Sequence, residues 1–550
     1  MAFEELLERA GGVGLFQALQ VATLLLPAIY TPFQMLLENF SAAVPDHRCW
    51  TQVLDNGSAT PANFTQEALL VVSIPLGPNQ QPHPCRRFRQ LQWQLLDPVM
   101  ATNWSEAATE QCVDGWVYDH SAFTATIVTK WDLVCDSQGL KPMGQSIYMA
   151  GILMGSFIWG LLSSRLGRKP MLSWCCLQVA VAGTSTTFAP NFLIYCGLRF
   201  LSAFGLAGII LVSSTMMAEW TTTQRRAVTM TILGCTHSMG QMVVAGLAFT
   251  LRDWQDLQLA VSVPFLAFSL VSWWLPESAR WLLITGRPNR ALQELKKVAR
   301  INGHKEAKKT LTIQVLMSSM EEEAVSARAH HSVLDLFRIP ALRKTTCTML
   351  MVNFSAQMSY YGLVLDLQSL GRDIFLLQAL FGAIDFLGRA TTLLLFRYFG
   401  RRVILAGSLA LAGSCILANG LVPQDLQSLR VALAVLGKGC FGISLTCLTI
   451  YRTELFPTPL RMTADGFQQS VGRLGAIVGP LIRMARQALP LLPPLSYGII
   501  PVASSLVLLL FLPETRGLPL PDTIEDLEGR RSATARGHQQ EVVIMESTWF

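Results

Sequence analysis

Twelve long apolar stretches constrain this chain of 550 residues more than any other feature of its sequence. A helix needs about 20 mostly apolar residues to cross the hydrocarbon core of a bilayer, and each stretch reaches or approaches that length. We therefore predict an all-α membrane protein with twelve transmembrane helices. The predicted spans cover residues 13–37, 144–163, 171–189, 192–218, 227–251, 258–275, 345–369, 374–398, 403–421, 427–451, 462–488 and 492–512.

The composition excludes several other classes of protein. Hydrophobic residues make up 51% of the chain and charged residues 15%, whereas soluble domains average about 25% charged residues. The net charge of +6 is too balanced for a nucleic-acid partner, because such proteins cluster basic residues on one face. The sequence has no Walker phosphate-binding motif and no zinc-ligand spacing such as CxxC or HExxH. We expect no enzyme activity, no metal and no other cofactor.

Lys and Arg are distributed unevenly between the short loops at the two ends of the spans. Cytoplasmic loops carry the excess of positive charge, so we predict that the richer set is cytoplasmic. Both termini then lie in the cytoplasm, and the long polar segment 38–141 lies outside. The richer set contains Arg165, Arg168, Lys169, Arg225, Arg226, Arg401, Arg402, Arg452 and Arg461, and the poorer set contains Arg252, Arg372 and Arg486.

The segment 38–141 carries two marks of an extracellular loop. The first is a group of N-glycosylation sequons, at Asn39, Asn56, Asn63 and Asn103. The second is a group of four cysteines, which implies two disulfides in an oxidising compartment. These are Cys49, Cys85, Cys112 and Cys135, and their three possible pairings stay open. A further sequon at Asn353 lies inside a predicted span, so we do not expect it to be used.

An internal repeat divides the chain into two six-helix units. Three signatures recur at nearly one offset: a Gly-Arg turn, a Glu at the end of a span, and a Pro-Glu pair. Two parallel repeats of six helices are the architecture of the major facilitator class. The matching positions are Gly167 and Gly400, Glu219 and Glu454, and Pro276 and Pro513, which are 233, 235 and 237 residues apart.

The repeat also gives the expected division of the chain. An N-terminal half covers residues 1–275 and includes the loop 38–141. A cytoplasmic linker with short helices covers 276–344, a C-terminal half covers 345–512, and a cytoplasmic tail covers 513–550.

Charged residues at the cytoplasmic ends of the spans are candidates for gating. Carboxylates and guanidinium groups form strong paired hydrogen bonds, and such clusters would hold the two halves together on the cytoplasmic side. The alternative is that these cations only obey the positive-inside rule. The candidates are Arg165, Arg168, Glu219, Arg225, Arg401, Glu454 and Arg461.

Three cations lie at membrane depth in the C-terminal half, and together they predict an anion site. An ionisable residue inside a span is costly and therefore marks a functional site. Arg473 lies about 16 Å along its predicted helix, near mid-bilayer, at 1.5 Å per residue. Arg389 and Lys438 are the other two. Alternatively, Arg389 pairs with Asp385 one turn away, and Lys438 is a packing feature. We interpret Arg199 and Arg430 as interfacial anchors.

Aromatic residues in the spans are candidates for the apolar walls that a bulky anion needs. Tyr360, Tyr361 and Phe441 are such residues, and His237 accompanies them as a polar ring. Simple core packing is an equal alternative for each of them. We expect His237 to be a hydrogen-bonded packing residue rather than a proton carrier.

Several motifs resemble the organic anion branch of the organic ion transporters, within the solute carrier superfamily. The resemblance covers residues 1–528 and implies the major facilitator fold. It also implies a plasma-membrane exchanger of organic anions, such as sulfated steroids and urate, against a dicarboxylate counter-ion, in epithelial cells. The motifs are ENFSAAVPDHRCW, QCVDGWVYDH, TKWDLVC, GRKP, PESARWL, YYGLVLDLQ, GKGCFG and ELFPT.

The resemblance assigns roles to individual residues and shows one departure. The matching Arg of the eleventh span and the cation of the eighth span, here Arg473 and Arg389, bind anions in that family. A tyrosine pair like Tyr360 and Tyr361 contacts substrate, and organic cation transporters carry Asp at the position of Arg473. The family usually has Asp where this chain has Ser164, so a carboxylate expected to pair across the cytoplasmic gate is absent.

Two other functions are compatible with parts of the sequence. A transporter of organic cations or zwitterions would keep the fold, but Arg473 argues against it. A receptor or scaffold would use the loop outside and the C-terminus inside, but it would need no cations at mid-depth. The last residues, Ser547 to Phe550, match a motif bound by PDZ domains, so we expect a PDZ-domain partner.

Overall fold

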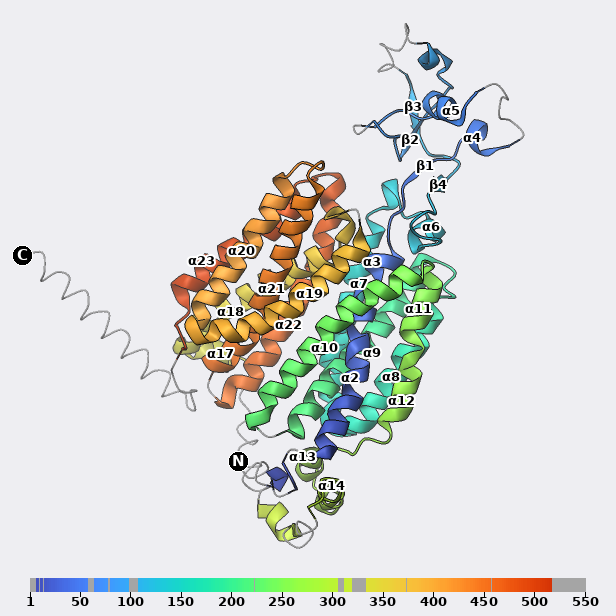
Figure 1. Ribbon diagram of the computed structural model, residues 1–550. Coiled ribbons are helices and arrows are strands. Elements are labelled where there is room, and N and C mark those ends of the chain that lie inside the picture. The colour runs from blue at the N-terminus through green and yellow to red at the C-terminus, as the bar shows by residue number, and fades with distance from the viewer. Residues whose placement is uncertain are drawn as a thin grey trace, which may run out of the picture.

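The computed structural model describes residues 6–8, 10–12, 14–57, 64–77, 80–97, 107–221, 223–304, 311–318, 333–371, 373–456 and 458–516. It confirms a helical bundle of two six-helix halves (Figure 1). The N-terminal half contains α2 (Leu15–Leu36), α7 (Leu140–Leu166), α8 (Arg168–Thr186), α9 (Phe192–Glu219), α10 (Thr223–Thr250), and the pair α11 (Trp254–Ser262) and α12 (Pro264–Ser272). The C-terminal half contains α18 (Pro340–Val364), α19 (Ile374–Tyr398), α20 (Arg401–Leu421), α21 (Gln427–Leu455), α22 (Thr458–Met484) and α23 (Leu492–Phe511).

Each predicted span corresponds to one of these helices or, in one case, to a pair. The span 258–275 is two consecutive helices, since Pro264 begins α12 and a proline cannot donate the backbone hydrogen bond that would continue α11. By length and composition, nine helices in the described part of the chain can cross a membrane. The other three, α8, α18 and α22, contain more polar residues and pack against neighbouring helices, as polar membrane helices do.

Glycines allow the closest helix contacts in the bundle. On α22, a Cβ at Gly475 would lie 2.5 Å from the carbonyl oxygen of Phe354, and one at Gly479 would lie 2.6 Å from that of Met358. Both partners belong to α18. Larger side chains would therefore force α18 and α22 apart, which explains why small residues occupy this seam. The two halves meet mainly where α10 packs on α19 and α7 packs on α22.

The described residues between 42 and 139 form a small domain at one end of the bundle, which we call the loop end (Figure 1). Its strands β1 (His47–Cys49) and β4 (Trp116–Tyr118) pair antiparallel, as do β2 (Arg86–Phe88) and β3 (Thr109–Gln111). Short helical segments complete it: α4 (Gln52–Asp55), α5 (Gln66–Ser73), η1 (Trp93–Leu96), α6 (Ile127–Trp131) and η3 (Cys135–Ser137).

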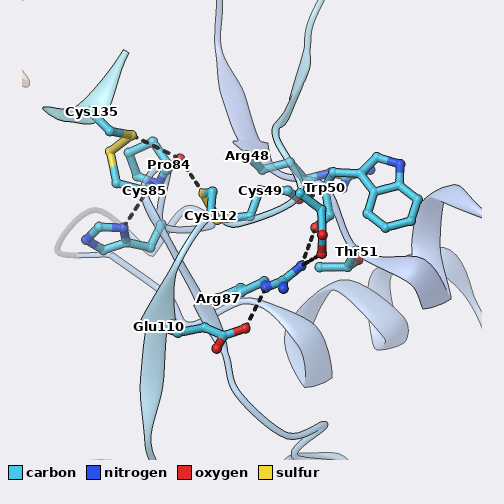
Figure 2. The surroundings of a disulfide bond; sticks show 12 residues. Arg48, Cys49, Trp50, Thr51, Pro84, Cys85, Arg87, Glu110, Cys112 and Cys135 are labelled. Carbon is cyan, nitrogen blue, oxygen red and sulfur yellow. Dashed lines mark hydrogen bonds and ion pairs between the residues drawn. A yellow bond between two sulfur atoms is a disulfide. The ribbon is translucent and has the colours of Figure 1, made fainter. Parts of the chain in front are cut away.

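Two disulfides stabilise this domain, as predicted, and the structure selects one of the three pairings (Figure 2). Cys49 bonds to Cys112, and Cys85 bonds to Cys135. The Arg87 side chain donates to Glu110 at 2.9 Å, to Asp114 at 2.7 Å and to the Trp50 carbonyl at 3.0 Å. A domain this small has little apolar core, so covalent links and ion pairs fix its shape.

The opposite end of the bundle, the linker end, carries the helices between the two halves. These are α13 (Ala279–Ile284), α14 (Pro288–Ile301) and α17 (Asp335–Arg338). Leu6, Leu7 and Phe16 pack with α13 and α14 in a separate apolar cluster. Asn302, just after α14, accepts a hydrogen bond from the Phe16 N–H at 2.9 Å, so α14 is attached to the start of α2.

The position of Asn39 argues against the predicted glycan at this residue. Asn39 lies in the short helix α3 (Glu38–Ser41), is 3% exposed, and donates to the Val364 carbonyl at 2.9 Å. An asparagine that is buried and bonded across the two halves has no room for a sugar. Asn56 is partly exposed after α4, and Asn63 and Asn103 lie outside the described residues. Asn353 is 2% exposed, as expected for a sequon that is not used.

These placements predict which substitutions change the glycosylated mass. Ser41→Ala destroys the first sequon but keeps the Asn39 hydrogen bond, so we expect no change in the shift on glycosidase treatment. Replacing Asn56, Asn63 and Asn103 together with glutamine is expected to remove the shift. Gel mobility of surface-labelled protein measures both, and a smaller shift for Ser41→Ala would show that Asn39 is glycosylated.

Candidate substrate site between the two halves

A single carboxylate on α19 organises the charges at mid-depth of the bundle. Asp385 is 3% exposed and accepts from the Lys438 Nζ of α21 at 3.1 Å. The Arg389 Nε, one turn further along α19, lies 3.5 Å away. From the other half, the α10 side chains of Ser238 and Gln241 donate to the same carboxylate at 2.7 and 3.4 Å. Four side chains from three helices therefore contact Asp385.

Lys438 is a buried member of this group and also contacts an aromatic ring. Its ammonium lies 4.7 Å from the ring centroid of Tyr360, in a cation–π contact that offsets part of the cost of burial. Tyr361 stands edge-on to Tyr360 with 5.2 Å between ring centroids. The structure thus brings Lys438 and Tyr360 together, and Lys438 itself has no exposed surface. Tyr361 is 8% exposed and, like Phe441, belongs to the main apolar core.

Arg389 is the more accessible of the two cations bound to Asp385. Its side chain is 28% exposed, and its Nε also donates to the Ser238 Oγ at 3.2 Å. The guanidinium lies against α10 at Gly234, where a Cβ would be 2.6 Å from Nη1. The possible pair with Asp385 is therefore confirmed, and Arg389 also contacts the opposite half.

Arg473 differs from the other two cations. It is half-buried on α22, and among the described residues it has neither an ion pair nor a hydrogen bond. His237 of α10 interacts electrostatically with Arg473 and with Arg389, Asp385 and Lys438, so it lies within the same group of charges. One carboxylate and three cations leave this site with a net positive charge.

Two expectations about individual residues are wrong. Phe441 has no exposed surface and belongs to the main apolar core, so it does not line a cavity here. Arg199 is not an interfacial anchor, because it is 1% exposed. It forms an ion pair with Glu38 at 3.3 Å and lies over the ring of Tyr148 at 4.1 Å. Arg430 is half-buried and donates to the Ser369 carbonyl at 3.0 Å.

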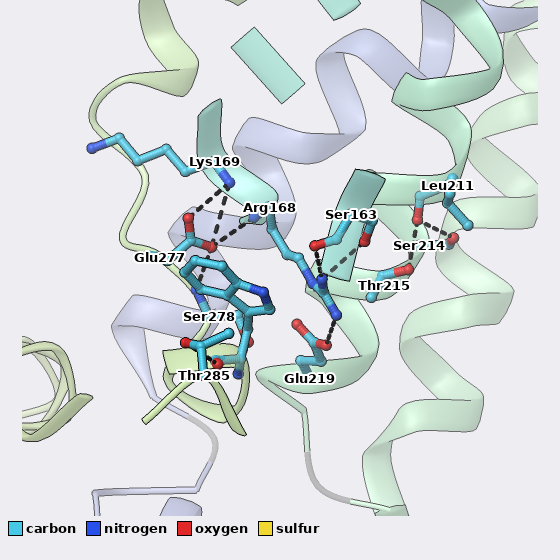
Figure 3. A network of polar contacts seen from close by, with 11 residues as sticks. Ser163, Arg168, Lys169, Leu211, Ser214, Thr215, Glu219, Glu277, Ser278 and Thr285 are labelled. Atoms are coloured by element: carbon cyan, nitrogen blue, oxygen red, sulfur yellow. Dashed lines mark hydrogen bonds and ion pairs between the residues drawn. The ribbon is translucent and has the colours of Figure 1, made fainter. Parts of the chain in front are cut away.

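The charged turns at the linker end form two equivalent networks, one in each half, and Figure 3 shows the network of the N-terminal half. Arg168 donates to Glu219 at 3.0 Å, and its backbone N–H donates to Glu277 at 2.9 Å. In the C-terminal half, Arg401 donates to Glu454 at 3.3 Å, and its backbone N–H donates to Glu514 at 2.9 Å. The same contacts at the same offsets confirm the internal repeat.

These networks correct the expected role of the gating residues. Each one joins helices of a single half, whereas we expected clusters that hold the two halves together. Burial raises the pKa of the Glu277 carboxyl above its ordinary value, although the hydrogen bonds that it accepts from backbone N–H groups act to lower the pKa. Arg165 is exposed, and the side chains of Arg225, Arg461 and Ser164 lie outside the described part of the structure.

Comparisons with known proteins identify the family. The family model "Sugar (and other) transporter" matches residues 106–526. Human solute carrier family 22 member 11 is 73% identical over 549 residues, which cover 100% of both chains. The chain belongs to solute carrier family 22. Human member 12 of the family is 52% identical over 554 residues, again with 100% of both chains covered.

The fold agrees with this membership. The inward-open structure of the E. coli xylose transporter XylE superposes with a TM-score of 0.60, covering 92% of this chain and 98% of that one at 15% identity. As a solute carrier family 22 member with the major facilitator fold, the protein is a transporter of organic ions and not an enzyme. It is a multi-pass protein of the plasma membrane.

In this family 22 member the loop end is closed by contacts that the sequence did not single out. Arg483 of α22 lies 3.5 Å from Asp366 and donates to the Leu365 carbonyl at 2.9 Å. It also donates to the Gln145 side chain of α7, in the other half. The only signal in the sequence was a charge near the end of the predicted span 462–488. We find that this charge bridges the halves.

Proposed function

We propose that this protein exchanges organic anions across the plasma membrane by alternating access, with a dicarboxylate as the counter-ion. The observation that carries the proposal is Arg473, a half-buried guanidinium at mid-depth without a carboxylate partner in the described structure. A guanidinium offers a planar fork that matches the oxygens of a carboxylate or sulfate. An anion in transit would be its partner, and the net positive charge around it supports the same class of ligand.

The walls of the site support amphipathic anions in particular. Tyr360 places an aromatic ring beside Lys438, and Tyr361 stands edge-on to Tyr360. His237 lies among the same charges. Rings of this kind provide the apolar surface that a bulky ligand needs. We therefore propose sulfated steroids, urate and similar anions as substrates, bound by Arg473 and Arg389.

The alternative, transport of organic cations, would need a free negative charge in the site. Asp385 is a carboxylate at the right depth, but Lys438 and Arg389 both pair with it. A buried carboxylate that already has two cationic partners leaves little attraction for a third cation. The site therefore favours anions.

The orientation of the protein follows from its charge pattern and its loop. Excess Lys and Arg at the linker end favour a cytoplasmic position for this end and for both termini, and two disulfides favour an extracellular position for the loop end. In the described structure the loop end is closed by contacts such as the bond from Asn39 to Val364.

The C-terminal PDZ motif lies beyond the described residues, and we propose that it anchors the protein in epithelial cells.

A vesicle experiment tests the exchange mechanism. Uptake of a labelled sulfated steroid is expected to rise when the vesicles are preloaded with α-ketoglutarate, a dicarboxylate. If a dianion leaves for each monoanion that enters, one negative charge moves out, and an inside-negative potential assists this by about 2.3 kcal/mol per 100 mV. Vesicles preloaded with gluconate, a monoanion, are the control. Equal uptake in both preparations would contradict exchange.

A further inference from the structure

The two oxygens of Asp385 have different partners. Oδ1 accepts from Lys438 at 3.1 Å. Oδ2 lies 3.5 Å from the Arg389 Nε and accepts from Ser238 at 2.7 Å and from Gln241 at 3.4 Å. One oxygen therefore faces a cation of its own half, and the other faces Arg389 and the opposite half.

The two cations differ in access and in distance. Lys438 has no exposed surface, so a solute in the site cannot reach it without rearrangement. Arg389 is 28% exposed, and its contact with Asp385 is the longer one. An arriving anion would therefore meet Arg389 while the pair of Asp385 and Lys438 stays intact.

We propose that Asp385 is a positioning residue that acts as the internal counter-ion of the anion site. In the empty site its Oδ2 holds Arg389, and the carboxylate or sulfate of the transported anion takes Arg389 from it. Lys438 keeps Asp385 paired during this exchange. An unpaired carboxylate inside the bundle, which would be very costly, is thereby avoided. This inference rests on the proposed transport of organic anions.

The same exchange links binding to the contact between the halves. Ser238 donates to Oδ2 and also accepts from Arg389 at 3.2 Å, and it belongs to α10 of the N-terminal half. When Arg389 turns towards an anion, Ser238 loses one of its two partners across the interface. Binding therefore weakens the contact between α10 and α19, which must change when the halves rock about the site.

The variant Asp385→Asn tests the inference through a split between KM and maximal rate. Removing the charge removes the internal competitor for Arg389, so the KM for a labelled sulfated steroid is expected to fall at least about threefold. The maximal rate per surface molecule is expected to fall, because binding no longer changes a charged contact with α10. Asp385→Glu, which keeps the charge, is expected to restore part of the rate and to raise KM towards the original value.

A matched control separates this role from simple loss of a buried ion pair. Glu38→Gln also removes a buried carboxylate from an arginine, Arg199, and we expect it to lower surface expression or rate without lowering KM. If Asp385→Asn fails to reach the surface, the double variant Asp385→Asn/Lys438→Gln removes both buried charges and is expected to show the same fall in KM.

The outcomes distinguish this inference from the function on which it rests. An unchanged or raised KM in Asp385→Asn, or in the double variant, would overturn the role of Asp385 while saturable anion uptake by the unmodified protein still supported the proposed function. Absence of saturable uptake by the unmodified protein at the surface would overturn the proposed function and this inference with it.

Discussion

Arg473→Ala is expected to lose most of the transport of organic anions while reaching the cell surface at a near-normal level. The guanidinium has no partner within the described structure, so its removal breaks no native ion pair. A hydrogen bond to a charged group contributes roughly 1.5–3 kcal/mol, or about 10- to 150-fold in apparent affinity. Initial uptake of a labelled anion, normalised to surface protein, measures the loss.

A graded series at Arg473 tests the chemistry more sharply than alanine alone. Arg473→Lys keeps the charge but loses the planar fork, so we expect partial activity. Arg473→Asp inverts the local field, and we expect no anion transport. The loss is expected to be larger for compact anions, since bulky steroids keep their aromatic contacts. Arg397→Ala removes an exposed guanidinium from α19 and is the matched control.

One result would move the proposed site. If Arg473→Ala transports anions with unchanged affinity, Arg473 has a structural role and the anion binds elsewhere. Arg389 would then be the next candidate, because it is partly exposed beside Asp385. The same series on Arg389 is expected to give a smaller effect, since its charge is already shared with a carboxylate.

Much of the fold could be predicted from the sequence, because membrane helices are recognisable by their length and their apolar content. The internal repeat could also be predicted, since the same turn occurs in both halves and requires the same residues in each. Arg168 with Glu277, and Arg401 with Glu514, show the reason: in each half a backbone N–H after a glycine donates to a carboxylate that follows the sixth helix. Short motifs at matching offsets encode these contacts.

The partners of the charged residues could not be predicted in the same way. Pairing depends on which helix faces reach across the bundle, and no local pattern states this. The i,i+4 spacing indicated Asp385 with Arg389, but Ser238, more than a hundred positions earlier in the chain, gave no such signal. The surroundings of Asn39 could not be predicted for the same reason. A sequon indicates a possible acceptor for a glycan, but the burial of Asn39 against Val364 depends on how the other half packs.

The closed loop end identifies the contacts that must break during transport. Asn39 and Gln145 of the N-terminal half donate to the carbonyls of Val364 and Leu365 in the C-terminal half at 2.9 and 3.0 Å. Arg483 joins the same group from α22. Asp366, Arg483 and Arg486 line a cavity of about 1130 Å³ beneath the loop domain. Opening of the site to this cavity requires that these bonds separate.

Arg483→Gln is expected to shift the protein strongly towards the state that is open at the loop end. Arg483 is 7% exposed and connects Asp366 with Gln145 across the halves. The bond from Arg483 to Gln145 joins the two halves only in the closed state. Losing this hydrogen bond from a charged group costs the closed state roughly 1.5–3 kcal/mol, while Asp366 keeps Arg486 as its partner. A cysteine at Leu365, which is 2% exposed, reports the shift through its reaction with a membrane-impermeant thiol reagent added outside.

A neighbouring arginine supplies the control, because it binds the same carboxylate from a more exposed position. Arg486 lies 2.5 Å from Asp366 but is 42% exposed, and exposed pairs contribute at most about 1 kcal/mol. Arg486→Gln is therefore expected to raise the labelling rate of Leu365→Cys only slightly, and Arg483→Gln far more. Leu365 is a suitable reporter because only its carbonyl bonds to Arg483 and Gln145, and cysteine keeps that carbonyl. Equal labelling in both variants would show that Arg483 does not hold the loop end closed, and that the bonds of Asn39 and Gln145 suffice.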